Sequence, residues 1–179
     1  NDAKLLQIIQ HFIAEPTEQP HVEFKENNTD PETIAKNISA IANTLIKNNT
    51  PRGYIIWGVS DSTHEIVGTN FTPETKKRGN EDIILWLKKH IKPELEVKFH
   101  TTIIDEKMVV VLVIHVNRIS VSKYDNVPYI RIDKNTRKLG DYAETEKQVW
   151  KEVVASEYET MSAITNLARE EVEALLDLN

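Results

Sequence analysis

The sequence contains no cysteine, only five glycines and no long apolar run. Without cysteine there is no disulfide and no thiolate zinc site, and we expect a reducing, cytoplasmic setting. The few glycines form no phosphate-binding loop of the Walker type and no Gly-x-Ser-x-Gly elbow, so no nucleotide cofactor is expected. No apolar run approaches the ~20 residues that cross a bilayer, and the polar start predicts no signal peptide, so we expect no membrane partner.

The charge of the chain is unevenly distributed. The 179 residues are 40% hydrophobic and 28% charged, which is typical of a globular protein, and the formal net charge is −6. Residues 144–179 hold nine acids and three bases, and so carry all of this net charge. Residues 1–143 are therefore neutral overall, and the net charge does not exclude binding to nucleic acid.

Apolar periodicity predicts helices interleaved with strands. The Asp30-Pro31 pair is typical of a helix start, and we expect Asn80 to cap a later helix. We expect helices near residues 2–13, 31–46, 80–91, 145–158 and 169–178, and strands near residues 18–25, 54–59, 65–68, 97–103, 108–116 and 129–133. This order predicts an α/β or α+β class, with a mixed β-sheet flanked by helices and with helices at the C-terminal end.

Three parts are expected along the chain. Residues 1–13 form an N-terminal helix, and residues 14–143 form the main domain. Residues 144–179 form an acidic helical segment, which we expect to lead into a further domain that is not present here.

The segment Glu18–Lys25 places an unusual set of polar residues on one short strand. Because strand side chains alternate between faces, His21, Glu23 and Lys25 share the face opposite Val22. Such a face suits contact with a charged ligand. A solvated edge strand is the alternative.

Three carboxylates form the candidate catalytic and metal site. Glu18 and Glu23 flank the first strand, and Asp61 follows the most apolar early strand. If they converge, their oxygens would suit Mg²⁺ or Mn²⁺, which can activate water for attack on a phosphodiester. Alternatively, Asp61 is an ordinary turn residue.

A second candidate surface is basic and lies near the end of the predicted strand at 129–133. Cations beside amide and hydroxyl groups suit contacts with nucleic-acid phosphates, and a solvated surface is the alternative. The bases of this strand end and the following loop are Arg131, Lys134, Arg137 and Lys138.

Several motifs, in this order, together resemble the Schlafen AlbA_2 domain over about residues 14–150. They are Glu18–Lys25, Ala40–Thr44, Gly53–Asp61, Ile66–Gly68 and Tyr129–Arg137. That domain is often described as a DNA-binding domain of bacterial transcriptional regulators. The chain departs from the family pattern after Asn43-Thr44, where a longer polar connection precedes the single glycine Gly53.

The resemblance implies site residues, a cofactor and partners. Nuclease members of the family use two glutamates and an aspartate to bind a divalent metal and cleave structured RNA such as tRNA. Glu18, Glu23 and Asp61 match those positions, and Lys25 matches the adjacent lysine. The fold of vertebrate members pairs two such lobes in one chain, so a single lobe implies a homodimer.

Three hypotheses follow from the sequence. The leading one is a nucleic-acid-binding domain that cleaves RNA with Mg²⁺ or Mn²⁺, using Glu18, Glu23 and Asp61, with Lys25 on the phosphate. The second is a non-catalytic DNA-binding module of a bacterial regulator that uses residues 131–138. The third is a structural dimerisation domain.

Overall fold

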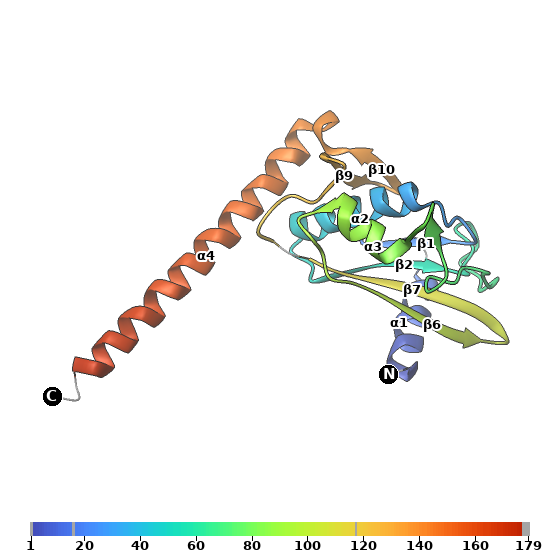
Figure 1. The fold of residues 1–179 in the computed structure, drawn as a ribbon, viewed down its shortest axis with the longest axis horizontal. Helices are drawn as coiled ribbons and strands as arrows, with labels where there is room; N and C mark the ends of the chain where they lie inside the picture. The colour runs from blue at the N-terminus through green and yellow to red at the C-terminus, as the bar shows by residue number, and fades with distance from the viewer. Residues whose placement is uncertain (1, 16, 117, 177–179) are drawn as a thin grey trace.

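A computed structural model describes residues 2–15, 17–116 and 118–176, and it shows helices packed on mixed β-structure (Figure 1). This arrangement confirms the predicted fold class. The helices are α1 (Asp2–Ala14), α2 (Pro31–Lys47), α3 (Ile83–His90), the short 3₁₀ helix η1 (Leu139–Asp141) and α4 (Ala143–Leu176). The strands are β1 (Val22–Lys25), β2 (Arg52–Trp57), β3 (Lys77–Arg78), β4 (Glu81–Asp82), β5 (Ile91–Lys92), β6 (Val97–Ile104), β7 (Lys107–His115), β8 (Lys123–Tyr124), β9 (Val127–Ile132) and β10 (Asn135–Lys138).

The strands form a main sheet, a second sheet and a short ribbon. The main sheet has the order β1-β2-β7-β6, and the second sheet has the order β10-β9-β8-β5. β1 runs parallel to β2, whereas the other pairs in both sheets are antiparallel. β6 and β7 form an antiparallel hairpin, at the positions of the strands predicted near residues 97–103 and 108–116. β3 and β4 pair only with each other.

Helix α2 lies between the two sheets, as Figure 1 shows. The Asp30 carboxylate caps it by accepting a hydrogen bond from the Thr33 amide, which confirms the predicted start. One face of α2 buries Ile38 and Leu45 in a cluster with Trp57 of the main sheet. Because the second sheet covers another face, α2 buries polar as well as apolar side chains.

Asn43 fastens α2 to the second sheet. Its Nδ2 donates to the carbonyl oxygens of Ser122 at 2.8 Å and Tyr129 at 2.7 Å, and its Oδ1 accepts from the Ser122 amide at 2.8 Å. Thr44 adds a further link, because its hydroxyl accepts a hydrogen bond from the backbone amide of Arg131 at 3.2 Å. The Asn43-Thr44 pair thus fixes the position of β9.

Helix α1 covers the other face of the main sheet. Its residues Leu5, Ile9 and Phe12 pack with Val22 and Phe24 of β1. This packing confirms the predicted N-terminal helix and explains its apolar stripe.

Gly53 is required where β2 passes close to α2. A Cβ at this position would clash with Cγ2 of Ile41 and lie 3.0 Å from the carbonyl oxygen of His21. A side chain would therefore separate the strand from the helix.

Several predicted boundaries are wrong. The strand predicted over residues 18–25 is confined to β1, and the return strand at 65–68 is reduced to one bridge between Val59 and Ile66. Asn80 does not cap α3, because the β3–β4 ribbon lies before it and Asp82 occupies the N-cap position. The loop predicted after the strand at 129–133 is instead the antiparallel partner β10.

The two helices predicted at the C-terminal end are one helix, α4, of 34 residues. No proline or glycine interrupts residues 143–176, so nothing in the backbone ends the helix. Val149 and Val153 pack against Ile130 and Leu139, whereas the following turns extend away from the sheets (Figure 1).

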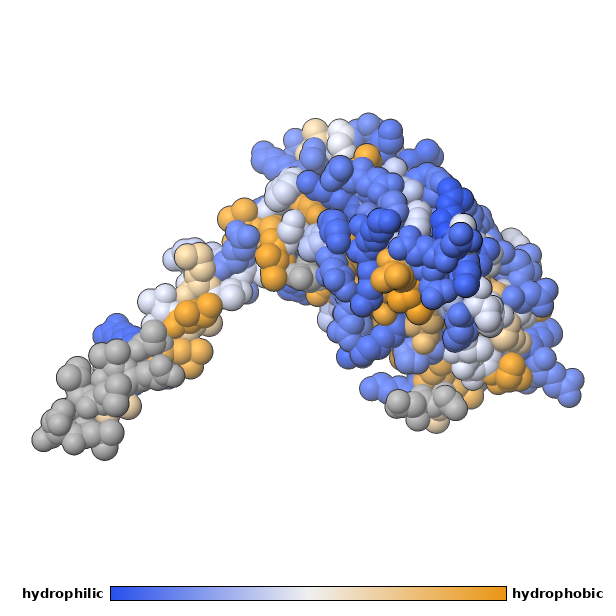
Figure 2. Space-filling view, in the orientation of Figure 1, coloured by the Kyte–Doolittle hydropathy of each residue, from blue (hydrophilic) through white to orange (hydrophobic). Residues whose placement is uncertain are grey.

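Apolar side chains lie exposed along α4 beyond its contact with the sheets, and they give the apolar surface visible on that helix in Figure 2. In the described part of the chain, no helix has both the length and the apolar character needed to cross a membrane. The exposed apolar residues of α4 are Trp150, Val154, Tyr158, Met161, Ile164 and Leu167.

Candidate functional site

Strand β1 directs its glutamate away from α1. Val22 and Phe24 are buried against α1, so the alternation of the strand turns Glu23 to the face of the sheet that α2 covers. β1 is the edge of the main sheet, as one alternative predicted, but its first three residues are buried. The polar face of this strand is therefore largely enclosed.

Arg131, in β9 of the second sheet, contacts Glu23. Its side chain is only 1% exposed, and its guanidinium forms ion pairs with the carboxylates of Glu23 and Glu18, the latter at 3.4 Å. Its Nε is buried without a hydrogen-bond partner within the described chain. A residue predicted for the basic surface thus lies inside the protein, where it links β9 to β1.

Glu18 is held at this cluster by the backbone as well. Its Oε1 accepts a hydrogen bond from the Phe24 amide at 2.6 Å, and its side chain is 2% exposed. Burial, with the charge of Glu23 as the next cause, raises the pKa of Glu18 to about 7, against the lowering effects of the Phe24 amide and Arg131. Glu18 can therefore gain or lose a proton near neutral pH.

Lys25 connects the cluster to the surface. Its ammonium group forms an ion pair with Oε1 of Glu23, while Oε2 of the same carboxylate faces Arg131. The Lys25 side chain is 23% exposed, so among these linked charged side chains it is the one that solvent or a ligand can reach. We call Glu18, Glu23, Lys25 and Arg131 the buried charge cluster.

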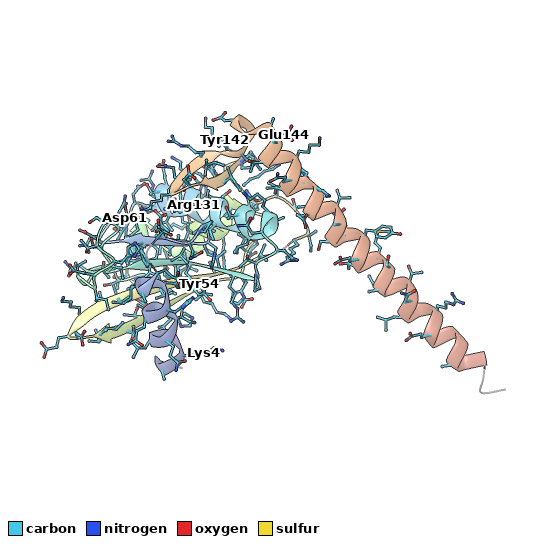
Figure 3. The ribbon with its side chains drawn as sticks, turned by 180° about the vertical axis from the view of Figure 1, so that it is seen from behind. Lys4, Tyr54, Asp61, Arg131, Tyr142 and Glu144 are labelled. Atoms are coloured by element: carbon cyan, nitrogen blue, oxygen red, sulfur yellow. The ribbon has the colours of Figure 1, made fainter. Side chains whose placement is uncertain are left out.

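Asp61 lies in an exposed turn after β2. Its charge is the last of the causes that raise the pKa of Glu18, and Figure 3 shows Asp61 on the same side of the molecule as Arg131. Across the described residues, however, no group of three or more His, Cys, Asp or Glu side chains is arranged to hold a metal ion. The oxygen donors suit Mg²⁺ or Mn²⁺, but cations already engage both carboxylate oxygens of Glu23, so this arrangement does not fit a three-carboxylate metal site.

The remaining predicted bases lie together on the β9–β10 hairpin. Lys134, Arg137 and Lys138 are exposed, and none of them forms an ion pair with another described residue. Thr136 on the same strand donates a hydrogen bond to Oδ1 of Asn37 in α2 at 2.7 Å, which holds the hairpin against the helix. We call Lys134, Arg137 and Lys138 the basic hairpin.

A model of one protein family matches residues 18–140, which is more than half of the chain, and its description is "Schlafen, AlbA_2". The chain belongs to the Schlafen AlbA_2 family. This match confirms the resemblance carried by the sequence motifs. The Schlafen AlbA_2 region contains both the buried charge cluster and the basic hairpin.

Two solved structures are similar to the Schlafen AlbA_2 chain. The DIP2311 protein from Corynebacterium diphtheriae aligns with a TM-score of 0.49 and 16% identity over 76% of this chain, which spans 30% of that protein. The N-terminal domain of a RecG-related protein from Nitrosomonas europaea aligns with a TM-score of 0.45 and 16% identity, over 72% of this chain and 86% of that one. Among curated proteins, none matches the sequence.

The sequence did not indicate two features of the region. The buried position of Arg131 was missed, although the two isoleucines beside it in β9 were a sign of a mostly buried strand. A polar pocket formed by separate loops near Asn27 and Lys76 was also missed, because its residues share no motif.

Proposed function

We propose that this domain binds nucleic acid through the basic hairpin, with Lys25 as a further phosphate contact. The observation that carries the proposal is the set of three exposed cations on one hairpin without an ion pair to any described residue. Such cations are available to neutralise phosphates and release their counterions.

The hydrogen bonds that hold the basic hairpin against α2 support this proposal. Asn43 and Thr44 hold β9 to α2, and Thr136 holds β10 to the same helix. Cations on a fixed scaffold lose less conformational freedom on binding than cations on a free loop, and they can follow the spacing of a folded nucleic acid. We therefore favour a structured RNA over an unstructured strand.

A binding measurement tests the proposal. Fluorescence anisotropy with a labelled tRNA is compared between the wild type and the double variant Arg137→Glu/Lys138→Glu. The exposed Lys4 of α1, far from the hairpin in Figure 3, provides the matched control Lys4→Glu. We expect the double variant to bind at least about tenfold more weakly than the wild type and the control. Equal affinities would overturn the proposal.

Duplex DNA of matched length separates the two nucleic-acid hypotheses. Tighter binding to the duplex than to tRNA would favour the DNA-binding module of a regulator. Tighter binding to tRNA would favour the RNA hypothesis, because A-form and folded RNA present a different backbone geometry.

A second candidate function is phosphodiester cleavage at the buried charge cluster. Glu18, with its pKa near 7, is suited to exchange a proton at neutral pH, and Lys25 can reach a phosphate. The family resemblance adds Mg²⁺ or Mn²⁺ held with Asp61, although the carboxylates as arranged are engaged by cations. Activity of this kind would require the metal to compete with Arg131 and Lys25 for Glu23.

Cleavage is tested by incubating tRNA with the protein in Mn²⁺ or in EDTA. We expect Asp61→Asn and Glu18→Gln to abolish a cleavage that depends on Mn²⁺, while Glu65→Gln, at a neighbouring position in the same turn region, leaves it unchanged. Cleavage that persists in EDTA or in both variants would overturn the proposed site. Binding without cleavage would leave the first function alone.

The exposed apolar face of α4 favours a homodimer. Val154, Tyr158 and Met161 recur at spacings of four and three residues, which places them on one face of the helix. On the helical wheel Glu152, Glu159 and Glu170 lie roughly 140–160° from Val154, whereas Glu157 lies roughly 60° from it, at the border of the apolar face. A second copy of α4 could pack on the apolar face with the first three acids turned to solvent, and we propose that copy as its partner.

A further inference from the structure

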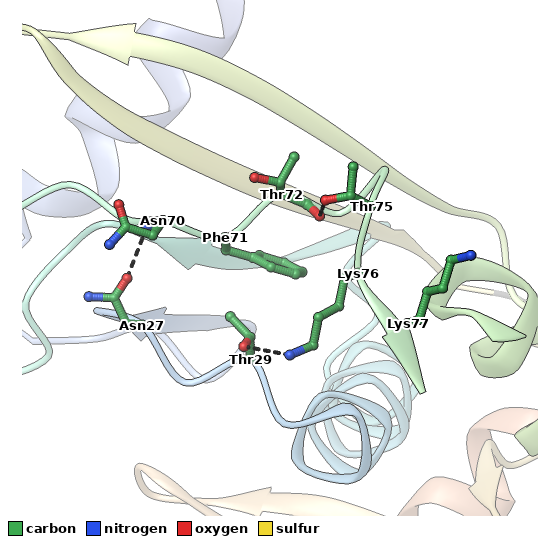
Figure 4. A pocket seen from close by; sticks show the side chains of 8 residues that line it. All are labelled: Asn27, Thr29, Asn70, Phe71, Thr72, Thr75, Lys76 and Lys77. Carbon is green, nitrogen blue, oxygen red and sulfur yellow. Dashed lines mark hydrogen bonds between the residues drawn. The ribbon is translucent and has the colours of Figure 1, made fainter. Parts of the chain in front are cut away.

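A pocket of about 510 Å³ opens beside the β3–β4 ribbon, separate from the buried charge cluster and the basic hairpin. Figure 4 shows that residues from two stretches distant in sequence, 27–29 and 70–77, surround it. Among the described residues no carboxylate lines it, although the chain has more acids than bases. The lining residues are Asn27, Thr29, Asn70, Phe71, Thr72, Thr75, Lys76 and Lys77.

Lys76 is the central cation of this pocket. Its side chain is half-buried and points toward Thr29, whose hydroxyl accepts a hydrogen bond from Nζ at 3.1 Å (Figure 4). Within the described chain, Lys76 forms no ion pair with a carboxylate. A half-buried ammonium group without a counter-ion favours the binding of an anion.

Asp30 and Glu32, which follow Thr29 in sequence, are already engaged, and the exposed carboxylates of Glu26 and Glu74 do not line the pocket. The Asp30 carboxylate accepts hydrogen bonds from the amide and the hydroxyl of Thr33, and Glu32 forms an ion pair with Arg78 at 2.7 Å. Neither carboxylate lines the pocket. The charge of Lys76 is therefore left for a ligand.

Neutral donors surround the same space. Oδ1 of Asn27 accepts hydrogen bonds from the Thr69 hydroxyl at 2.8 Å and from the Asn70 amide at 3.1 Å, which fixes the Asn27 side chain at the rim. Since the amide oxygen is used twice, the Nδ2 group of Asn27 is the part left to donate. Thr29 accepts from Lys76 and keeps its own hydroxyl proton.

Lys77 adds a second positive charge at the edge. It lies 3.8 Å from Asp82, and both side chains are more than half exposed, so this surface ion pair is weak. The pocket thus offers two lysines, hydroxyl groups and amide donors, and no described carboxylate lines it. Such a set of donors suits the oxygens of a phosphate group.

We propose that the Lys76 pocket binds a phosphate group. This chemistry is shared by a free nucleotide and by a backbone phosphate of nucleic acid, and the pocket does not depend on the function assigned to the basic hairpin. A phosphate there would contact Lys76 and the hydroxyl and amide donors of Thr29 and Asn27.

The experiment is an NMR titration of the whole chain labelled with ¹⁵N. Inorganic phosphate is added first, then AMP and a short single-stranded oligonucleotide in separate samples, at constant ionic strength. We expect saturable shifts at the amides of Asn27, Asn70 and Lys76. Lys76→Gln should weaken phosphate binding by at least about tenfold. Lys76→Arg should retain binding, and Lys98→Gln, an exposed lysine of β6 outside the pocket, is the matched control.

The outcomes separate the sources of the phosphate. Saturable shifts with AMP but not with the oligonucleotide identify a free nucleotide, and the same shifts with the oligonucleotide identify a backbone phosphate; both support the pocket. No saturable shift with inorganic phosphate, or equal affinity in wild type and in a folded Lys76→Gln, would overturn it. A response to AMP in a protein that does not respond to inorganic phosphate would also overturn it, because the contact would then be with the nucleoside.

The hairpin variant separates phosphate binding in the pocket from tRNA binding at the basic hairpin. Arg137→Glu/Lys138→Glu leaves the pocket intact, so its phosphate titration should match the wild type even if tRNA binding is lost. A loss of both in that variant would contradict a separate pocket.

Discussion

The guanidinium of Arg131 forms an ion pair with the carboxylate of Glu23 inside the protein, where the two side chains are 1% and 8% exposed. The pair joins β9 of the second sheet to β1 of the main sheet, around α2. Because Glu23 also binds Lys25, this one carboxylate connects the interior to the surface. The arrangement makes the buried charge cluster a structural element as well as a candidate site.

We expect Arg131→Met to lower the free energy of unfolding by about 3–5 kcal/mol, because it leaves the buried Glu18 carboxylate without its cation and the Glu23 carboxylate with Lys25 alone. Urea denaturation measures this loss. Arg137→Met, on the exposed hairpin strand, is the matched control and should change stability by less than about 0.5 kcal/mol. Similar stabilities of the two variants would contradict the buried pair.

We expect the titration of Glu18 to make the free energy of unfolding depend on pH. Its pKa rises from 4.5 in the unfolded chain to about 7 in the folded one, so between these values the folded state binds more protons. The stability that this group contributes is therefore complete below about pH 4.5 and is lost as the pH rises through about 7. Relative to Glu18→Gln, the wild type should lose up to roughly 3 kcal/mol across that window.

Urea denaturation of wild type and Glu18→Gln over this pH range measures the effect. The difference between the two proteins isolates Glu18 from the other titrating groups. A difference that stays constant over the whole range would contradict the raised pKa.

We expect Asn43→Ala to destabilise the fold by about 2–3 kcal/mol, because the Ser122 amide and the Tyr129 carbonyl lose a partner in a buried place, while the Ser122 carbonyl keeps the Ser39 hydroxyl. Asn48→Ala, at the exposed end of α2, is the control and should have little effect. Denaturation midpoints check this prediction. Equal midpoints would show that Asn43 does not fasten the second sheet.

Self-association through α4 is tested by light scattering after size exclusion. We expect Tyr158→Glu/Met161→Glu to convert a dimer to a monomer, because both side chains, 73% and 68% exposed, would be buried between two copies. Leu85→Glu is the control, since Leu85 of α3 is 59% exposed but lies off this helix. A wild type that is monomeric, or a dimer unaffected by the double change, would contradict the proposed interface.

The sequence predicted those parts of the fold that depend on local pattern. The stripes of α1 and α2, the Asp30 cap and the β6–β7 hairpin are confirmed, because each is set by the spacing of neighbouring residues. The continuity of α4 was missed: two helices were predicted, near residues 145–158 and 169–178, although no proline or glycine lies between them.

The candidate site was predicted only in part. Glu18 and Glu23 were singled out and do lie together, but the burial of Arg131 depends on β9 crossing α2 through the hydrogen bonds of Asn43 and Thr44. Alternation within β9 cannot reveal which face another element will cover. The pocket at Lys76 likewise depends on loops that only the tertiary fold brings together.

The salt dependence of tRNA binding measures whether the basic hairpin contacts nucleic-acid phosphates. The slope of log K against log salt concentration counts the phosphates neutralised, with about 0.7–0.9 for each. We predict that Arg137→Gln/Lys138→Gln lowers the magnitude of this slope by about 1.4–1.8, while Lys4→Gln leaves it unchanged. A slope that is the same in all three proteins would contradict the account.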